Sequence, residues 1–187
     1  MGRLEEYFAA WARAHPDVRA VLVVGAPTTL RTPTPTWTPP WLPTTLRHGL
    51  YLPALDRTWI RFVEGRQVSS ITTRFLEWSV RKLEAVGKKV LVLIWDNASW
   101  HVSKEVRRWL GSHNRRVKES GDGVRIVGCL LPKQSPWLNA IESKWIHGKR
   151  KVVEADGLLG AYELADRVCK VFDCPHHEHL TVPQEVA

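Results

Sequence analysis

Two acidic residues stand where a folded chain could use a carboxylate for chemistry. The first, Asp96, directly follows the apolar run KVLVLIW at 89–95. Such a run is typical of a central strand, and open α/β sheets bind ligands at the carboxyl ends of their strands. The position therefore predicts a functional role for Asp96. An Asp that begins an Asx turn fits the same sequence and stays open as the alternative.

The second acid, Glu142, belongs to the stretch LLPKQSPWLNAIESKW at 130–145. Two prolines indicate an irregular start, and Leu138, Ile141 and Trp145 then recur at helical spacing. Glu142 is therefore expected in the first turns of a helix that follows a strand. The alternative is an exposed glutamate favoured by the positive end of the helix dipole.

Together the two acids indicate a site for a hard cation. Carboxylate oxygens suit Mg²⁺ or Mn²⁺, which keep several waters and need few protein ligands. Two such ions, roughly 3.5–4 Å apart, stabilise the attacking and leaving oxygens of phosphodiester cleavage. A centre of that kind normally needs a further carboxylate, and the sequence supplies only Asp96 and Glu142 as obvious candidates.

Hydrophobic periodicity predicts the elements that would position these residues. Strands are expected at 18–24, 46–55, 58–65, 89–95 and 124–131, and helices at 3–14, 70–86, 138–151, 158–172 and from the N-cap Ser103 to about Val117. Helix 70–86 should bury Ile71, Phe75, Leu76, Val80, Leu83 and Val86 and end near Gly87, and strand 124–131 should be buried. Early strands joined by turns and later strands joined by helices predict an α/β fold, with a mixed sheet and helices on both faces.

Composition divides the chain into three segments. Residues 1–45 hold the first helix, one strand and an irregular tract, residues 46–175 form the α/β domain, and residues 176–187 are a C-terminal tail. The tract is unusual because 25–55 contains no acid, while 27–53 holds seven prolines and eight threonines. Proline removes backbone donors, so this tract cannot form a regular helix or a central strand.

The charge of the chain is localised. The 187 residues carry a net charge of +8, and the window 97–153 alone holds 12 basic and 4 acidic residues. This excess predicts a polyanion partner, most commonly nucleic acid, although a solubilising surface would also be basic. The candidates for contacting DNA are Lys133, Lys144, Lys149, Arg150 and Lys151. The alternative for the run HGKRK at 147–151 is a helix end that favours cations.

The remaining composition argues against several classes of protein. No apolar run approaches the ~20 residues of a membrane span, so no membrane partner is expected. The three cysteines form no CxxC pair, and the His-rich CPHHEHL at 174–180 matches no standard zinc spacing. A reducing cytoplasm is the expected location.

The motifs DNASWH at 96–101 and LPKQSPWLNAIESKW at 131–145 resemble the DDE transposases of bacterial insertion sequences, in the mariner-like superfamily. The resemblance covers about residues 46–175 and implies an RNase H-like fold and a DDE endonuclease domain. It implies that Asp96 and Glu142 are the second and third catalytic carboxylates, that both bind Mg²⁺ or Mn²⁺, and that Asn97 and His101 support the site. The resemblance implies DNA as the partner, both as element ends and as target. It implies a bacterial cytoplasmic protein that associates with the nucleoid when bound to DNA. A homodimer is possible and is left open.

The sequence departs from the family pattern at three places. Ala140 replaces the usual proline of the second motif, and 45 residues separate Asp96 from Glu142, more than is common. The first family Asp belongs at the end of the first strand, where this chain has Gly25-Ala26-Pro27. Two interpretations follow. One is a transposase that cleaves DNA and transfers strands, here lacking its first carboxylate through truncation or a frameshift. The other is a non-catalytic DNA-binding remnant or a repurposed protein.

Overall fold

The computed structural model describes residues 20–25, 46–64, 68–133, 135, 138–153 and 161–182. The predicted helix at 3–14 and the Pro/Thr-rich tract beyond Gly25 lie outside these residues. The described elements are β1 (Ala20–Gly25), β2 (Leu46–Leu52), η1 (Pro53–Leu55), β3 (Arg57–Glu64), α2 (Ser69–Ala85), β4 (Val90–Trp95), α3 (Lys104–Ser120), β5 (Arg125–Leu130), α4 (Ala140–Val153), α5 (Ala161–Val171) and β6 (Leu180–Thr181).

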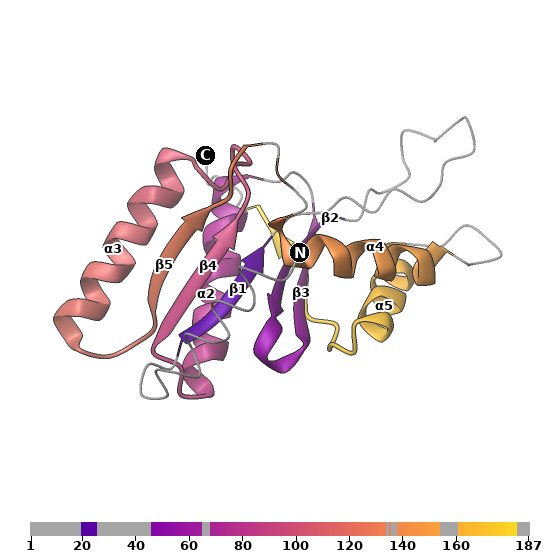
Figure 1. Cartoon of the computed structure of the whole chain (residues 1–187), viewed down its shortest axis with the longest axis horizontal. Helices are drawn as coiled ribbons and strands as arrows, with labels where there is room; N and C mark the ends of the chain where they lie inside the picture. The colour runs from indigo at the N-terminus through magenta and orange to yellow at the C-terminus, as the bar shows by residue number, and fades with distance from the viewer. Residues whose placement is uncertain are drawn as a thin grey trace.

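These strands form one mixed sheet in the order β5-β4-β1-β2-β3-β6 (Figure 1). The β1–β2 and β2–β3 pairs are antiparallel, whereas β1–β4, β4–β5 and β3–β6 are parallel. The predicted division into early antiparallel and later parallel strands is confirmed. The sheet also includes β1, which was predicted as a strand of the N-terminal segment before Leu46. The short strand β6 was not predicted from the sequence.

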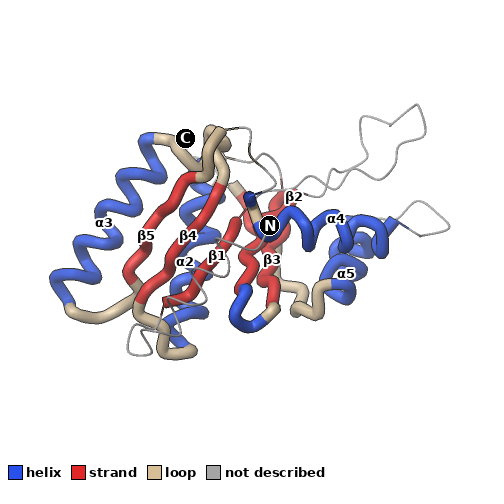
Figure 2. The backbone as a smooth tube through the Cα atoms, viewed as in Figure 1, coloured by secondary structure: helices blue, strands red, loops and turns tan. Residues whose placement is uncertain are grey.

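Helices α2 and α3 cover one face of the sheet (Figure 2). The buried side chains between them, here called the α2–α3 cluster, are Leu50, Leu52, Val63, Ile71, Phe75, Leu76, Val80, Leu83, Leu91, Leu93, Trp95, Val106, Val124, Ile126 and Leu180. The predicted stripe of α2 is confirmed except for Val86, which is 58% exposed because it follows the last helical turn. Gly87 then takes a positive φ of 69°, as a residue past a helix end commonly does.

Helices α4 and α5 pack on the other face (Figure 1). The side chains buried there, the α4–α5 cluster, are Tyr51, Ile60, Phe62, Ile94, Leu131, Ala140, Ile141, Trp145, Val152, Leu164, Ala165, Val168 and Cys169. Close approach of α4 to β2 requires a glycine at position 49, because a Cβ there would collide with the ring of Trp145. The sequence stretch that carries Glu142 is therefore fixed against the middle of the sheet.

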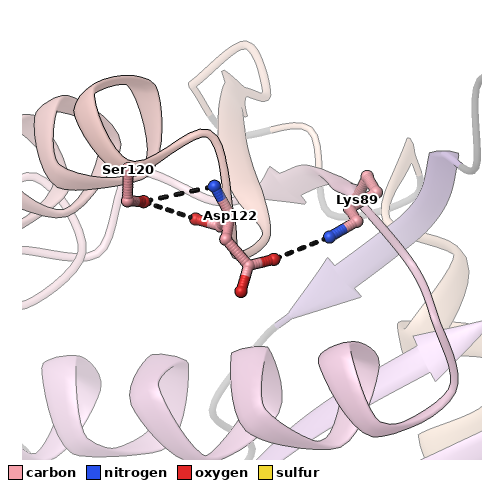
Figure 3. Close-up of polar contacts among 3 residues, drawn as sticks. All are labelled: Lys89, Ser120 and Asp122. Carbon is pink, nitrogen blue, oxygen red and sulfur yellow. Dashed lines mark hydrogen bonds and ion pairs between the residues drawn. The ribbon is translucent and has the colours of Figure 1, made fainter.

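The connection from α3 to β5 is a tight polar turn (Figure 3). Ser120 Oγ accepts a hydrogen bond from Asp122 N at 3.2 Å and donates one to Asp122 O at 3.0 Å. Across the turn, Lys89 Nζ lies 2.8 Å from Asp122 Oδ1 and joins it to the start of β4 (Figure 3). These contacts help to align β5 with β4, which pair from Val90 and Arg125 onward.

The expectation that strand 124–131 is buried was only partly right. Residues Val124 and Ile126 are buried, but Val127 is 41% exposed and Leu130 51% exposed. The reason is that β5 lies at the edge of the sheet, with α3 on one face only. None of the helices in the described ranges combines the length and apolarity that crossing a membrane requires.

Candidate active site at the carboxyl end of β4

A short loop after β4 holds Asp96 in a fixed position. One oxygen, Oδ1, accepts hydrogen bonds from Ala98 N at 3.0 Å and from His101 Nδ1 at 2.7 Å. The backbone closes the same loop, because His101 N donates to Ala98 O at 2.8 Å. The bond to Ala98 is that of an Asx turn. The turn engages Oδ1 alone, so both interpretations of Asp96 remain compatible with its geometry.

His101 anchors this loop to the sheet. Its ring is 3% exposed and stacks on Trp95, with centroids 5.0 Å apart and planes 18° apart. Partial burial raises the pKa of the Asp96 carboxyl, but the hydrogen bonds from His101 and Ala98 outweigh it, so this pKa lies below its usual value. The carboxylate is therefore ionised at neutral pH, as a cation ligand must be.

Asn97 connects the loop to the neighbouring strand. Its Nδ2 donates to Leu131 O at 2.5 Å, and Leu131 N in turn donates to Trp95 O at 2.8 Å. The segment that leaves β5 toward α4 is thus held beside the segment that leaves β4. Asn97 and His101, both predicted as supporting residues, contact the structure around Asp96 directly or through the backbone.

Glu142 lies in the first turn of α4, as the sequence predicted. Its backbone N donates to Asn139 O at 2.9 Å, and its side chain is partly exposed. The preceding residue, Ile141, belongs to the α4–α5 cluster together with Ile94 and Leu131. The two carboxylates are therefore carried by segments that both contribute to the α4–α5 cluster, through Ile94 and Ile141. Their approach to within ~10 Å, the reach of one ion and its ligands, stays a prediction.

The register of β1 and β4 identifies where a further carboxylate would belong. The two strands run parallel, with Val24 beside Ile94 and Gly25 beside Trp95. Asp96 directly follows Trp95, so a partner carboxylate from β1 is expected at about the end of that strand. β1 reads AVLVVG, with no acid.

Asp56, the nearest acid in sequence after β1, is engaged elsewhere. It lies past the end of β2 in the left-handed conformation and contacts Lys144 Nζ at 2.6 Å and the Tyr51 hydroxyl at 2.8 Å. These bonds, with that from Lys144 first, lower the pKa of the Asp56 carboxyl. β2 runs antiparallel to β1, and its residue Tyr51 pairs with Val24. The chain that continues from Tyr51 to Asp56 therefore runs toward the start of β1, away from the strand end that precedes Asp96.

The side chains present fit one hard cation better than two. Both hydrogen bonds described for the Asp96 carboxylate go to Oδ1. Among the described residues, however, no three His, Cys, Asp or Glu side chains converge in a way that could hold a metal ion. Two carboxylates with water fit a loosely held Mg²⁺, whereas a pair of ions needs more negative charge.

The basic candidates differ in their surroundings. Lys133 and Lys151 are exposed, whereas Lys144 pairs with Asp56 and lies 4.9 Å from the centre of the Tyr51 ring. The side chains of Lys149 and Arg150 lie outside the described region of the structure. Sequence reasoning missed the Lys144–Asp56 contact because 88 positions separate the two residues.

The histidines near the C-terminal end form a hydrogen-bonded chain. His176 Nε2 and His179 Nε2 lie 3.1 Å apart, and the opposite ring nitrogens contact Asp166 at 2.6 Å and Glu64 at 3.3 Å. The ring centroids are 5.3 Å apart. A head-on N–H···N bond accounts for this arrangement, which ties α5 to β3.

With this geometry established, comparison with known proteins assigns the family. The family model of DDE superfamily endonucleases matches residues 54–156, more than half of the chain. The chain belongs to the DDE superfamily of endonucleases. The match includes both carboxylates and their motifs, so the resemblance to DDE proteins seen in the sequence is confirmed, while the bacterial insertion-sequence origin stays a prediction. No curated protein matches the chain in sequence.

Solved structures share the fold of this DDE endonuclease domain. The Mos1 transposase paired-end complex with left transposon end matches with a TM-score of 0.55 at 13% identity, over 91% of this chain and 52% of that one. The catalytic domain of Mos1 mariner transposase gives 0.52 and 14%, over 91% and 78%. A simian T-cell lymphotropic virus intasome in complex with PP2A regulatory subunit B56 gamma gives 0.54 and 12%, over 80% and 47%. The chain spans about half the length of the Mos1 paired-end and intasome chains that it matches. The predicted RNase H-like α/β fold is confirmed.

Proposed function

We propose that this chain is the DNA-binding endonuclease domain of a transposase that, by itself, cannot carry out metal-dependent cleavage and strand transfer. One observation carries the proposal: the parallel register of β1 and β4 pairs Gly25 with Trp95, the residue before Asp96, and β1 supplies no acid there. Family membership supports DNA phosphodiesters as the substrate class, and the acid-free end of β1 supports the lack of activity. The alternative is a repurposed DNA-binding protein, which would also bind DNA without cleaving it.

Each residue of the site has a definite task in this proposal. Asp96 and Glu142 would hold the divalent ion, which when bound supplies charge stabilisation to the phosphate under attack. His101 keeps Asp96 ionised and oriented through the 2.7 Å bond to Oδ1. Asn97 holds the segment that follows β4 to the segment that follows β5, at the carboxyl ends of these strands. The missing element is negative charge on β1, without which a second ion is not retained.

DNA is the proposed partner on independent grounds. The net charge of +8 supports it, and so do the structural neighbours, which include a complex with a transposon end and an intasome. We expect sequence-independent binding in which Lys133, Lys149, Arg150 and Lys151 contact phosphates. Binding of this kind weakens steeply between about 50 and 200 mM salt, because each phosphate contact releases counterions.

A nicking assay tests the catalytic half of the proposal. The purified chain is incubated with supercoiled plasmid in Mg²⁺ or in Mn²⁺, beside the Asp96→Asn variant. We expect the two proteins to give the same background of nicked circles. Metal-dependent nicking by the unaltered chain that Asp96→Asn removes would show that another residue supplies the missing ligand, and the proposal would fail.

A gain-of-function pair makes the test sharper. Ala26→Asp adds a carboxylate directly after Gly25 in sequence, as Asp96 directly follows Trp95, whereas Gly25→Asp adds one at the position that pairs with Trp95. Neighbouring strand positions point to opposite faces, so only the first should help. We expect Ala26→Asp to nick plasmid in Mn²⁺, and the activity to disappear with Glu142→Gln. Equal behaviour of the two Asp variants would contradict the register argument.

A further inference from the structure

A groove on the α2 side of the sheet is separate from the site at β4. It has a volume of about 680 Å³ and lies between the exposed side of α2, strand β3 and the segment 178–181 around β6. Four cations line it: Arg61, Arg74, Arg81 and Lys82. Asp96, Glu142 and the residues described in contact with them are not among those that line the groove. The groove therefore calls for its own explanation.

The cations of the groove are satisfied by neutral groups, not by carboxylates. Arg61 donates to Glu178 O at 2.6 and 3.0 Å, and Arg74 donates to Thr181 O at 2.7 Å. Lys82 Nζ lies 4.8 Å from the ring centres of both Trp59 and Trp78. Within the described ranges, no carboxylate forms an ion pair with any of the four cations. The hydrogen bonds orient the charges but do not cancel them.

Burial, and to a smaller extent the neighbouring cations, lower the pKa values of groups around the groove. Burial and the nearby Arg81 lower the pKa of the Arg61 guanidinium, with Glu178 opposing them. Burial and Arg61 also lower the pKa of the Lys82 ammonium. The imidazole of His177 follows, since burial and the two cations lower its pKa as well. An anion in the groove would relieve this repulsion.

We propose that the groove is a second DNA-binding site, which takes the phosphodiester backbone of a duplex. Arg81 and Arg74 are exposed at its mouth and can reach phosphate oxygens, while Arg61 and Lys82 set the positive potential from beneath. The rim acids Glu77 and Glu178 reduce this potential without abolishing it, because four cations face two carboxylates. The inference rests on the proposed DNA-binding function and adds a contact surface on the α2 side of the sheet.

Charge substitution with a matched control tests the groove. The double variant Arg74→Gln/Arg81→Gln removes two exposed cations from it, and Arg107→Gln/Arg108→Gln removes two exposed cations from α3. Binding of a duplex of about 20 base pairs is followed by fluorescence anisotropy across a salt series. Each lost phosphate contact removes about 0.9 from the salt slope, so the groove variant should bind about 10-fold or more weakly, with a slope lower by about 1 to 2.

The control decides between a site and a net-charge effect. Equal weakening by the groove and α3 variants would show that only total charge matters and would overturn the inference. Loss of binding through Lys149→Gln/Arg150→Gln/Lys151→Gln but not through the groove variant would also overturn it, while leaving the proposed function intact. Absence of DNA binding by the unaltered chain would instead defeat the proposed function itself.

A second measurement needs no variant that must fold. Phenylglyoxal modifies accessible arginines, and mass spectrometry locates the products. With duplex bound to the unaltered chain, Arg74 and Arg81 should be protected several-fold, whereas Arg107 and Arg108 should react as they do without DNA. Modification of Arg74 and Arg81 at an unchanged rate in saturating DNA would contradict the inference.

Discussion

The carboxyl ends of β4 and β1 lie next to each other in the sheet, where Trp95 pairs with Gly25. They differ in whether a carboxylate and its hydrogen-bond partners are present. At the end of β4, Asp96 is ionised, bonded to His101 and Ala98, and connected to the next loop through Asn97. At the end of β1, the chain has Gly25 and then Ala26. The two strands pair with each other from Ala20 and Val90 to Gly25 and Trp95, so their pairing does not depend on an acid at the end of β1.

The difference teaches that fold and chemistry have separate physical origins in this domain. The sheet is held by two buried clusters, and neither of them includes Asp96 or Glu142. A chain can therefore lose a catalytic carboxylate and keep the fold that once positioned it. Two kinds of substitution test this comparison. One destabilises the packed core that supports both strand ends, and the other changes a residue at one end only.

The largest loss of stability is expected from Trp145→Ala, which changes the packed core of the domain and not one strand end alone. Trp145 is 1% exposed, lies over Gly49 and meets Phe172 edge-on with ring centroids 4.9 Å apart. Truncating a fully buried tryptophan leaves a cavity, and we expect a loss of about 4 kcal/mol in the free energy of unfolding. Urea denaturation measures it. The neighbouring Ile146, 51% exposed, is the control, and its replacement by Ala should change stability by less than about 0.5 kcal/mol.

A smaller effect, confined to the β4 end, is expected from His101→Ala. The change removes a buried ring from its stack on Trp95 and leaves Asp96 Oδ1 with one partner fewer. We expect a loss of about 2 kcal/mol in urea denaturation. His147→Ala, at an exposed position of α4, should be nearly neutral. Equal effects of the two changes would mean that His101 does not support the loop.

Ser103→Ala acts one step further along the same loop. Ser103 Oγ accepts a hydrogen bond from Val106 N at 3.2 Å and so caps α3, as the sequence predicted. Loss of the cap should cost about 1 kcal/mol. Ser112, exposed in the middle of α3, is the matched control, because alanine there favours the helix. A cost at position 112 as large as that at position 103 would argue against a specific capping role.

Sequence was sufficient to predict most elements because their signals are local. The stripe of α2, the cap at Ser103 and the apolar run of β4 each act within one segment, and the structure agrees with them. The exposure of Val127 was not predictable, because it depends on the place of β5 at the sheet edge. Strand order is set by contacts between distant segments, which hydrophobic periodicity does not encode.

The candidate site was predictable in the same uneven way. The places of Asp96 after a strand and of Glu142 in the first turn of a helix follow from local signals and are confirmed, while their shared role stays a prediction. The basic window 97–153, treated as one feature of the sequence, is divided in space: Arg107 and Arg108 lie on α3, while Lys144 and Lys151 lie on α4, across the sheet. The cationic groove was missed because Arg61, Arg81 and Thr181 meet only after folding.

The smallest expected effect is the most direct measure of the comparison between the two strand ends. If Asp96 and Glu142 share one Mg²⁺ with weak affinity, about 10 mM Mg²⁺ should raise the free energy of unfolding by less than about 1 kcal/mol. Asp96→Asn should remove this increment, and an equal ionic strength of NaCl should not reproduce it. Ala26→Asp adds an anion directly after Gly25, the residue of β1 that pairs with Trp95, so the increment should grow toward about 2 kcal/mol as affinity rises. Thermal unfolding of the variants with and without Mg²⁺ gives these differences. An increment that is large in the unaltered chain, or that Asp96→Asn leaves in place, would mean that the ion binds elsewhere and that the end of β1 is not what limits the site.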